Sequence, residues 1–150
     1  MMTDQKFLES ITESFKKFIS AGSSASTMKL KPLHGAIAKD IADRLGEDYE
    51  IKSQGYGNGK EANVMGAYTD KNVDITIYDK RSDSDKPIAG ISVKFVMQNY
   101  KQNSKNYFHD MIGETANLRS AGIQYFNVFI SLDTLPYYKD DKTRGTKIIH

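Results

Sequence analysis

The sequence contains no cysteine, so it can form neither a disulfide framework nor a metal site with thiolate ligands. No apolar run approaches the roughly 20 residues that a membrane-spanning helix needs. The N-terminus also lacks the apolar region of a signal peptide. These absences fit a cytoplasmic protein, and we expect that location.

Net charge is also small, because 21 Lys and Arg stand against 19 Asp and Glu, for a sum of +2. Overall charge therefore gives little support for nucleic-acid binding, and any basic surface must be local. The glycine-rich stretch at 55–61 lacks the Lys-Ser/Thr of a phosphate-binding loop, and no GxGxxG is present, which argues against nucleotide binding. A length of 150 residues favours a single domain with a modest core.

Hydrophobic periodicity predicts two helices in the first third of the chain. The first covers residues 3–19 and is followed by a flexible Gly/Ser linker within 21–30. The second covers 32–45, where apolar residues recur every four positions and Gly46 provides the stop.

Strands dominate the middle of the chain. We expect a short strand at 49–52, then a hairpin of 63–68 and 73–79 around a turn at 69–72. Residues 88–97 are apolar on both faces up to Ser92, as in a central strand. The expected order is a helix, a three-strand meander, a helix and a strand.

The second half contains the last helix and the last strand. The helix covers 104–121, and its expected buried face consists of Phe108, Met111, Ile112, Thr115 and Leu118. The strand covers 123–132 and is terminated by Pro136, and residues 137–150 show no regular element.

One carboxylate and one lysine suggest chemistry. Asp74 lies near the start of strand 73–79, and Ser92 and Lys94 lie toward the end of strand 88–97. In an antiparallel pair these ends coincide, and residues 92 and 94 point to one face, so the three side chains can converge. A carboxylate there binds a hard cation, and a lysine can orient the attacking water and stabilise charge on a phosphate.

Each of these residues also has an ordinary structural explanation. Asp74 could cap the preceding turn, Lys94 could extend from a strand end to solvent, and Ser92 could be a packing residue. The histidines His34, His109 and His150 lack spacing suited to a zinc site, which favours surface roles for them.

Asp74, then 17 intervening residues, then Ser92-Val93-Lys94 resembles the signature of the PD-(D/E)XK nuclease superfamily. The resemblance covers residues 31–135 and implies an α/β fold with a mixed sheet, the restriction-endonuclease-like α-β-β-β-α-β core. It divides the single domain 1–150 into an extra N-terminal helix (1–20), a linker (21–30), the core (31–135) and a tail (136–150). It implies a Mg²⁺-dependent DNA endonuclease, most like a type II restriction endonuclease, that cuts double-stranded DNA as a homodimer.

The chain departs from this signature at two positions. Val73 replaces the proline, which is commonly tolerated, and Ser92 replaces the second acid, which deletes a metal ligand. The resemblance supplies two candidates for the missing carboxylate: Glu114 on the following helix, or Glu61 as an upstream glutamate. The implied metal ligands are then Asp74, Glu114 or Glu61, and the Val93 carbonyl, with Lys94 as the catalytic lysine.

The residues after the lysine strand form a polar, basic and aromatic run that faces DNA in the resembled enzymes. The implied DNA contacts are Gln98, Tyr100, Lys101, Lys105 and, on the helix, Arg119. A solvated loop is an alternative for this run. Arg119 could equally pair with neighbouring groups.

Two other functions remain open from the sequence. The first is a repair or recombination nuclease of the junction-resolvase kind. The second is a DNA-binding module that keeps the fold without catalysis, which the serine at position 92 favours. Because the resembled enzymes are usually longer, a fragment that holds the catalytic core without its specificity element also stays open.

Overall fold

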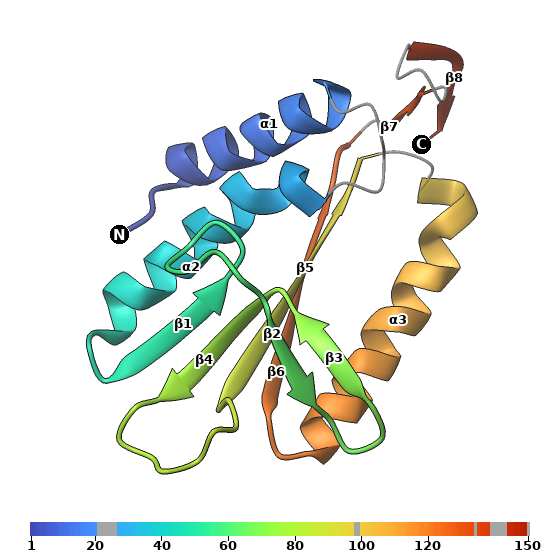
Figure 1. The fold of residues 1–150 in the computed structure, drawn as a ribbon. Helices are drawn as coiled ribbons and strands as arrows, with labels where there is room; N and C mark the ends of the chain where they lie inside the picture. The colour runs from blue at the N-terminus through green and yellow to red at the C-terminus, as the bar shows by residue number, and fades with distance from the viewer. Residues whose placement is uncertain (21–26, 98–99, 134, 139–143, 150) are drawn as a thin grey trace.

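A computed structural model describes residues 1–20, 27–97, 100–133, 135–138 and 144–149. These residues form a mixed α/β structure, in which helices lie on both sides of a four-stranded mixed sheet (Figure 1). The strand order is β1-β4-β5-β6. The four strands are β1 (Tyr49–Ser53), β4 (Ile75–Asp79), β5 (Ala89–Val96) and β6 (Gln124–Ser131). β4 pairs antiparallel with both β1 and β5, whereas β5 and β6 run parallel.

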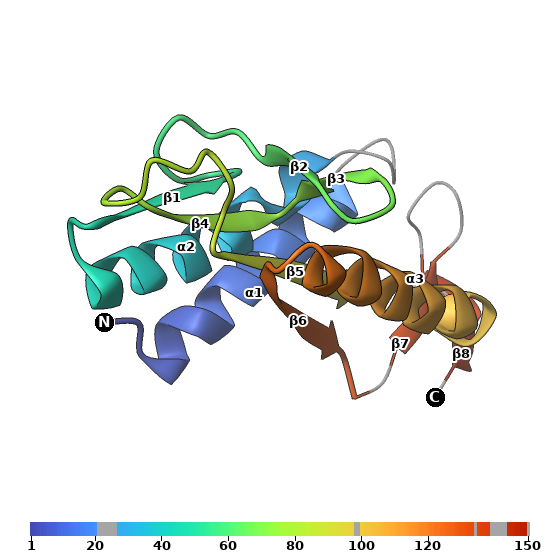
Figure 2. The ribbon, with the colours of Figure 1, turned by 90° about the horizontal axis from the view of Figure 1, so that it is seen from below.

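Helices α1 (Asp4–Ser20) and α2 (Lys31–Leu45) pack against one side of the sheet, and α3 (Tyr100–Ser120) packs against the other (Figure 2). The predicted second helix is confirmed: a proline lies in its first turn, and Gly46 ends it at a φ of 79°. The core on this side includes Leu33, Ile37 and Ile75. The short helix η1 (Thr27–Leu30) precedes α2, so the end of the predicted linker is helical, and residues 21–26 lie outside the described ranges.

The predicted hairpin of 63–68 and 73–79 is wrong. Strand β2 (Ala62–Met65) pairs instead with β3 (Asp70–Val73), in a separate two-stranded sheet. The chain changes direction at Asp74, because Val73 packs with Leu118 of α3, whereas Ile75 packs into the α2 side of the core. The strand predicted at 63–68 was expected to pair with 73–79. In the structure β4 pairs instead with β1, the short strand predicted at 49–52.

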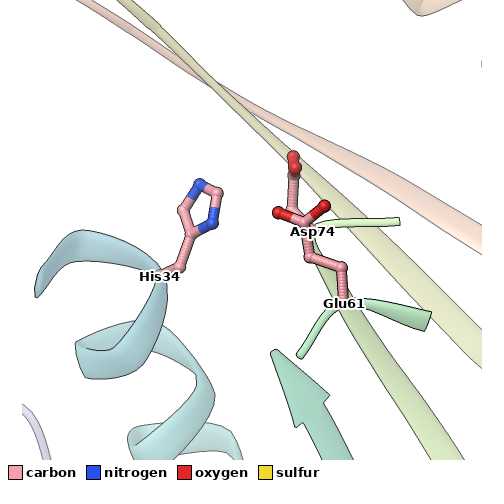
Figure 3. A group of neighbouring side chains, drawn as sticks. All are labelled: His34, Glu61 and Asp74. Atoms are coloured by element: carbon pink, nitrogen blue, oxygen red, sulfur yellow. The ribbon is translucent and has the colours of Figure 1, made fainter. Parts of the chain in front are cut away.

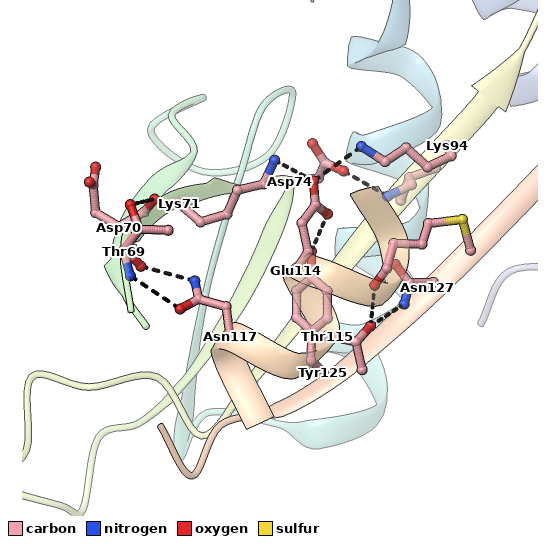
Figure 4. A network of polar contacts seen from close by, with 12 residues as sticks. Thr69, Asp70, Lys71, Asp74, Lys94, Glu114, Thr115, Asn117, Tyr125 and Asn127 are labelled. Atoms are coloured by element: carbon pink, nitrogen blue, oxygen red, sulfur yellow. Dashed lines mark hydrogen bonds and ion pairs between the residues drawn. The ribbon is translucent and has the colours of Figure 1, made fainter. Parts of the chain in front are cut away.

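The β2–β3 hairpin is fastened to α3 by Asn117 (Figure 4). The side-chain amide oxygen of Asn117 (Oδ1) accepts hydrogen bonds from the backbone N–H groups of Tyr68 and Thr69, at 2.9 and 3.2 Å. Its amide nitrogen donates to the Thr69 carbonyl at 2.9 Å. Gly66 permits this close approach, since a Cβ there would collide with the Asn117 side chain. The hairpin, and with it Lys71, is thereby held beside the helix.

The predicted buried face of the last helix is partly wrong. Leu118 is fully buried, but Phe108 and Ile112 are 46% and 68% exposed. Asn117 is buried instead, because its hydrogen bonds to the hairpin satisfy its polar atoms. The helix also begins at Tyr100, before the predicted start at 104.

The C-terminal region was wrongly predicted to lack regular structure. Strands β7 (Leu135–Tyr138) and β8 (Arg144–Ile149) pair antiparallel, and Pro136 lies inside β7 rather than ending β6. A proline is tolerated in such a two-stranded sheet, where each strand has a free edge. No helix in the described part of the chain is long and apolar enough to cross a membrane.

Candidate metal centre

Asp74 lies at the junction between β3 and β4, where the chain passes from one sheet to the other. Its Oδ2 atom accepts a hydrogen bond from the backbone N–H of Val93, at 2.6 Å. β4 and β5 pair with Ile75 opposite Ile91, so the backbone of the Ser92–Lys94 segment lies beside Asp74. The carboxylate is therefore fixed against the strand that carries the lysine.

Two further side chains converge on Asp74 (Figure 3). His34, Glu61 and Asp74 each offer a ligand atom, and these atoms all lie within 4.8 Å of one another. His34 comes from the first turn of α2, and Glu61 comes from the segment directly before β2. A cluster of one imidazole and two carboxylates therefore occupies the junction between α2, the glycine-rich loop and the sheet.

Close backbone contact between α2 and the glycine-rich loop brings these groups together. A Cβ on Gly35 would lie 2.5 Å from the carbonyl oxygen of Gly55, and a Cβ on Gly55 would collide with the carbonyl of Lys31. Gly55 also has a φ of 83°, which side chains rarely permit. The glycines thus allow the first turn of α2, which carries His34, to lie directly on the loop that leads to Glu61.

Replacing Gly35 with alanine tests this contact. The helix gains about 1 kcal/mol of propensity, but overpacking against the loop backbone costs about 1–3 kcal/mol, so we expect a net loss of stability. Gly113→Ala on α3 is the matched control, because a Cβ there meets nothing within 4 Å and should stabilise the fold. Denaturant unfolding of both variants measures the difference. Equal stabilisation by the two substitutions would show that the α2–loop contact is not tight.

The His34 ring is buried and lacks a protein partner. Its exposed fraction is 1%, and neither ring nitrogen has a hydrogen-bond partner among the described residues. Burial lowers the pKa of His34, although the Asp74 charge opposes this change. A neutral imidazole keeps one nitrogen lone pair, which can bind a metal ion.

The two carboxylates repel one another. Burial, followed by the nearby Asp74 charge, raises the pKa of Glu61, and Lys71 acts in the opposite direction. A bound divalent cation would relieve this repulsion and would give His34 a partner. The donor set therefore fits a metal ion, with two oxygen ligands and one nitrogen ligand.

Glu114 lies in a different set of contacts, close to Lys94 (Figure 4). Its Oε1 atom is 2.7 Å from the Lys71 ammonium and 3.4 Å from the Lys94 ammonium, and its Oε2 atom accepts a 3.0 Å hydrogen bond from the Tyr125 hydroxyl. Burial would raise the pKa of Glu114, but the Lys71 hydrogen bond and the two lysine charges outweigh it, so the pKa is lowered. Glu114 is thus an ionised partner of two lysines, whereas Glu61 is the acid beside Asp74.

Comparisons of the chain with protein-family models, with curated proteins and with solved structures found no match.

Of the residues expected to contact DNA, Arg119 and Tyr100 make contacts within the fold. Arg119 donates two hydrogen bonds to the Tyr125 carbonyl, at 3.2 and 2.9 Å, so it supports the turn between α3 and β6. Tyr100 packs edge-on against Phe129, with ring centroids 6.3 Å apart, and Lys105 is exposed. Gln98 lies outside the described residues, as does the side chain of Lys101.

Two residues of this region were missed by the sequence analysis. The surface role expected for His34 is wrong, since the ring is buried beside two acids. Helical spacing could have revealed it, because position 34 shares a face with the buried Ile37 and Ala38. Lys71 carries no comparable signal, because its contact with Glu114 depends on how the β2–β3 hairpin docks on α3.

Proposed function

We propose that the chain is a divalent-metal-dependent endodeoxyribonuclease of the PD-(D/E)XK kind, most like a type II restriction endonuclease. The observation that carries this proposal is the cluster of His34, Glu61 and Asp74. Asp74 accepts a hydrogen bond from the backbone of β5, the strand that carries Lys94. Apart from the β2–β3 hairpin, which is inserted between β1 and β4, the element order α2-β1-β4-β5-α3-β6 supports the proposal, since it matches the α-β-β-β-α-β order of the resembled core.

Asp74, Glu61 and His34 are the residues that would hold the cation, and the cluster compensates for the serine at position 92. Ser92 is 2% exposed and offers no carboxylate, whereas Glu61 and His34 each offer a further metal-ligand atom beside Asp74. When bound, a divalent cation provides a Lewis acid that polarises the scissile phosphate and offsets its charge. The expectation of Mg²⁺ follows from oxygen ligands such as Asp74 and Glu61.

Lys94 and Lys71 supply positive charge next to this centre. Glu114 holds both ammonium groups on one carboxylate oxygen, which fixes the lysines without removing their charge. Lys94 would orient the attacking water and stabilise the negative charge that develops on the phosphate. With one centre for each strand of the duplex, cleavage of both strands uses two copies of the chain, so a homodimer is part of the proposal.

Plasmid cleavage tests this function. Wild-type protein should nick or linearise supercoiled DNA in Mg²⁺ or Mn²⁺, and a chelator should stop the reaction. Lys94→Ala should lower the rate by about 10²-fold, because it removes the charge that orients the water. Lys80→Ala, an exposed lysine in the turn after β4, is the matched control and should cut normally. Absence of cleavage by wild-type protein with either ion contradicts the proposal.

A non-catalytic DNA-binding module is the second candidate, and the buried Ser92 is the observation that favours it. Such a module binds duplex DNA with a strong dependence on salt but leaves it intact in both metal ions. A filter-binding or anisotropy titration at several salt concentrations, run beside the cleavage assay, separates the two functions.

A further inference from the structure

We propose that the centre of His34, Glu61 and Asp74 prefers Mn²⁺, a transition-metal ion, over Mg²⁺. The inference deepens the proposed function, since it concerns the cation of the same centre. It rests on the nitrogen ligand, which the carboxylate signature of the sequence does not contain.

The first support is the state of the His34 side chain. The ring is 1% exposed, and both of its nitrogens lack a hydrogen-bond partner among the described residues. A buried polar ring is normally hydrogen-bonded. An unpartnered imidazole beside two carboxylates therefore indicates that a ligand binds to its nitrogen. A metal ion held by those carboxylates is a partner that lies within reach of the ring.

The second support is the rigidity of the position. His34 lies in the first turn of α2, next to Gly35, whose missing side chain lets the helix touch the backbone of Gly55. Leu33 and Ile37, which flank His34 on the helix, are buried in the core. The helix turn that carries the imidazole is therefore held by packing, and the ring lies within reach of Glu61 and Asp74 (Figure 3).

The third support is ligand chemistry. Mg²⁺ takes oxygen ligands almost exclusively and keeps much of its water shell. Imidazole nitrogen is a better ligand for first-row transition ions, and carboxylates suit Mn²⁺ as well as Mg²⁺. A set of two carboxylates and one imidazole, with no thiolate anywhere in the chain, therefore matches Mn²⁺ better than Mg²⁺.

Binding measurements on the full chain test the preference without relying on cleavage. Calorimetric titration should give an affinity for Mn²⁺ at least about tenfold above that for Mg²⁺. His34→Gln, which replaces the nitrogen ligand by an amide, should reduce this ratio by about tenfold, mainly through weaker Mn²⁺ binding. His109→Gln, the same substitution at an exposed histidine of α3, is the control and should leave the ratio unchanged.

Pulsed electron paramagnetic resonance of the Mn²⁺ complex gives a direct test in the wild-type protein. Echo modulation from a coordinated ¹⁴N nucleus is expected, and labelling histidine with ¹⁵N should replace it by the ¹⁵N pattern. The signal should persist in His109→Gln. Because this test uses the native sequence, it decides the point even if His34→Gln fails to fold.

The outcomes separate this inference from the function. Cleavage without nitrogen coupling, or with equal Mn²⁺ and Mg²⁺ affinities, overturns the inference and leaves the nuclease proposal in place. Nitrogen coupling and Mn²⁺ preference without cleavage support the inference and remove the nuclease proposal.

Discussion

Asp74→Asn should reduce metal-dependent DNA cleavage by at least about 10³-fold, because it removes the central carboxylate of the cluster. Asp74 connects the metal cluster to the strand that carries Lys94. It shares the cluster with His34 and Glu61, and it accepts the Val93 N–H on the lysine strand. An amide at this position cannot supply the negative charge that a divalent cation requires.

The substitution is chosen so that folding is preserved. The amide oxygen of asparagine can still accept the hydrogen bond from Val93, so β4 and β5 should keep their connection. Denaturant unfolding should therefore stay close to wild type while calorimetry shows metal binding lost. Asp83→Asn, in the exposed loop after β4, is the matched control and should behave like the wild type. Cleavage within tenfold of wild type for Asp74→Asn would contradict the assignment of this carboxylate.

The second large effect is a contrast between two glutamates. Glu61→Gln should weaken metal binding and lower cleavage by about 10³-fold, because it leaves Asp74 as the remaining acid of the cluster. Glu114→Gln should leave metal affinity near wild type and lower cleavage by about 10–100-fold, because Lys71 and Lys94 lose the charge that holds them. Calorimetric titration with Mn²⁺ and single-turnover cleavage at saturating metal measure the two effects separately.

The opposite result for the two glutamate substitutions would also identify the metal ligand. If Glu114→Gln abolishes metal binding and Glu61→Gln does not, Glu114 is the ligand and the lysine contacts must rearrange when the cation binds. Glu114→Gln keeps a hydrogen-bond acceptor for the Tyr125 hydroxyl, so loss of that contact does not confuse the result. Glu13→Gln, in an exposed i, i+4 ion pair on α1, is the control for removing one glutamate charge.

Much of the sheet could be predicted from local patterns. Residues 88–97 read as a central strand because they are apolar on both faces up to Ser92, and the structure places β5 between β4 and β6. The i, i+4 stripe of α2 and its glycine stop are equally local features. The hairpin was mispredicted because Val73 and Ile75 are both apolar. Nothing in their immediate neighbourhood shows that one packs on α3 and the other on the α2 side.

The sequence by itself determined that Asp74 lies at the start of one strand of the main sheet and Lys94 in the next strand along the chain, because the alternation that marks each strand is a property of a short segment. Only the tertiary structure decided which acid joins Asp74. Glu61 reaches it, together with His34, because Gly35 and Gly55 let α2 lie on the loop. Glu114 is held instead by lysines, one of them on a hairpin docked through Asn117. These contacts join segments far apart in the chain, so no local pattern encodes them.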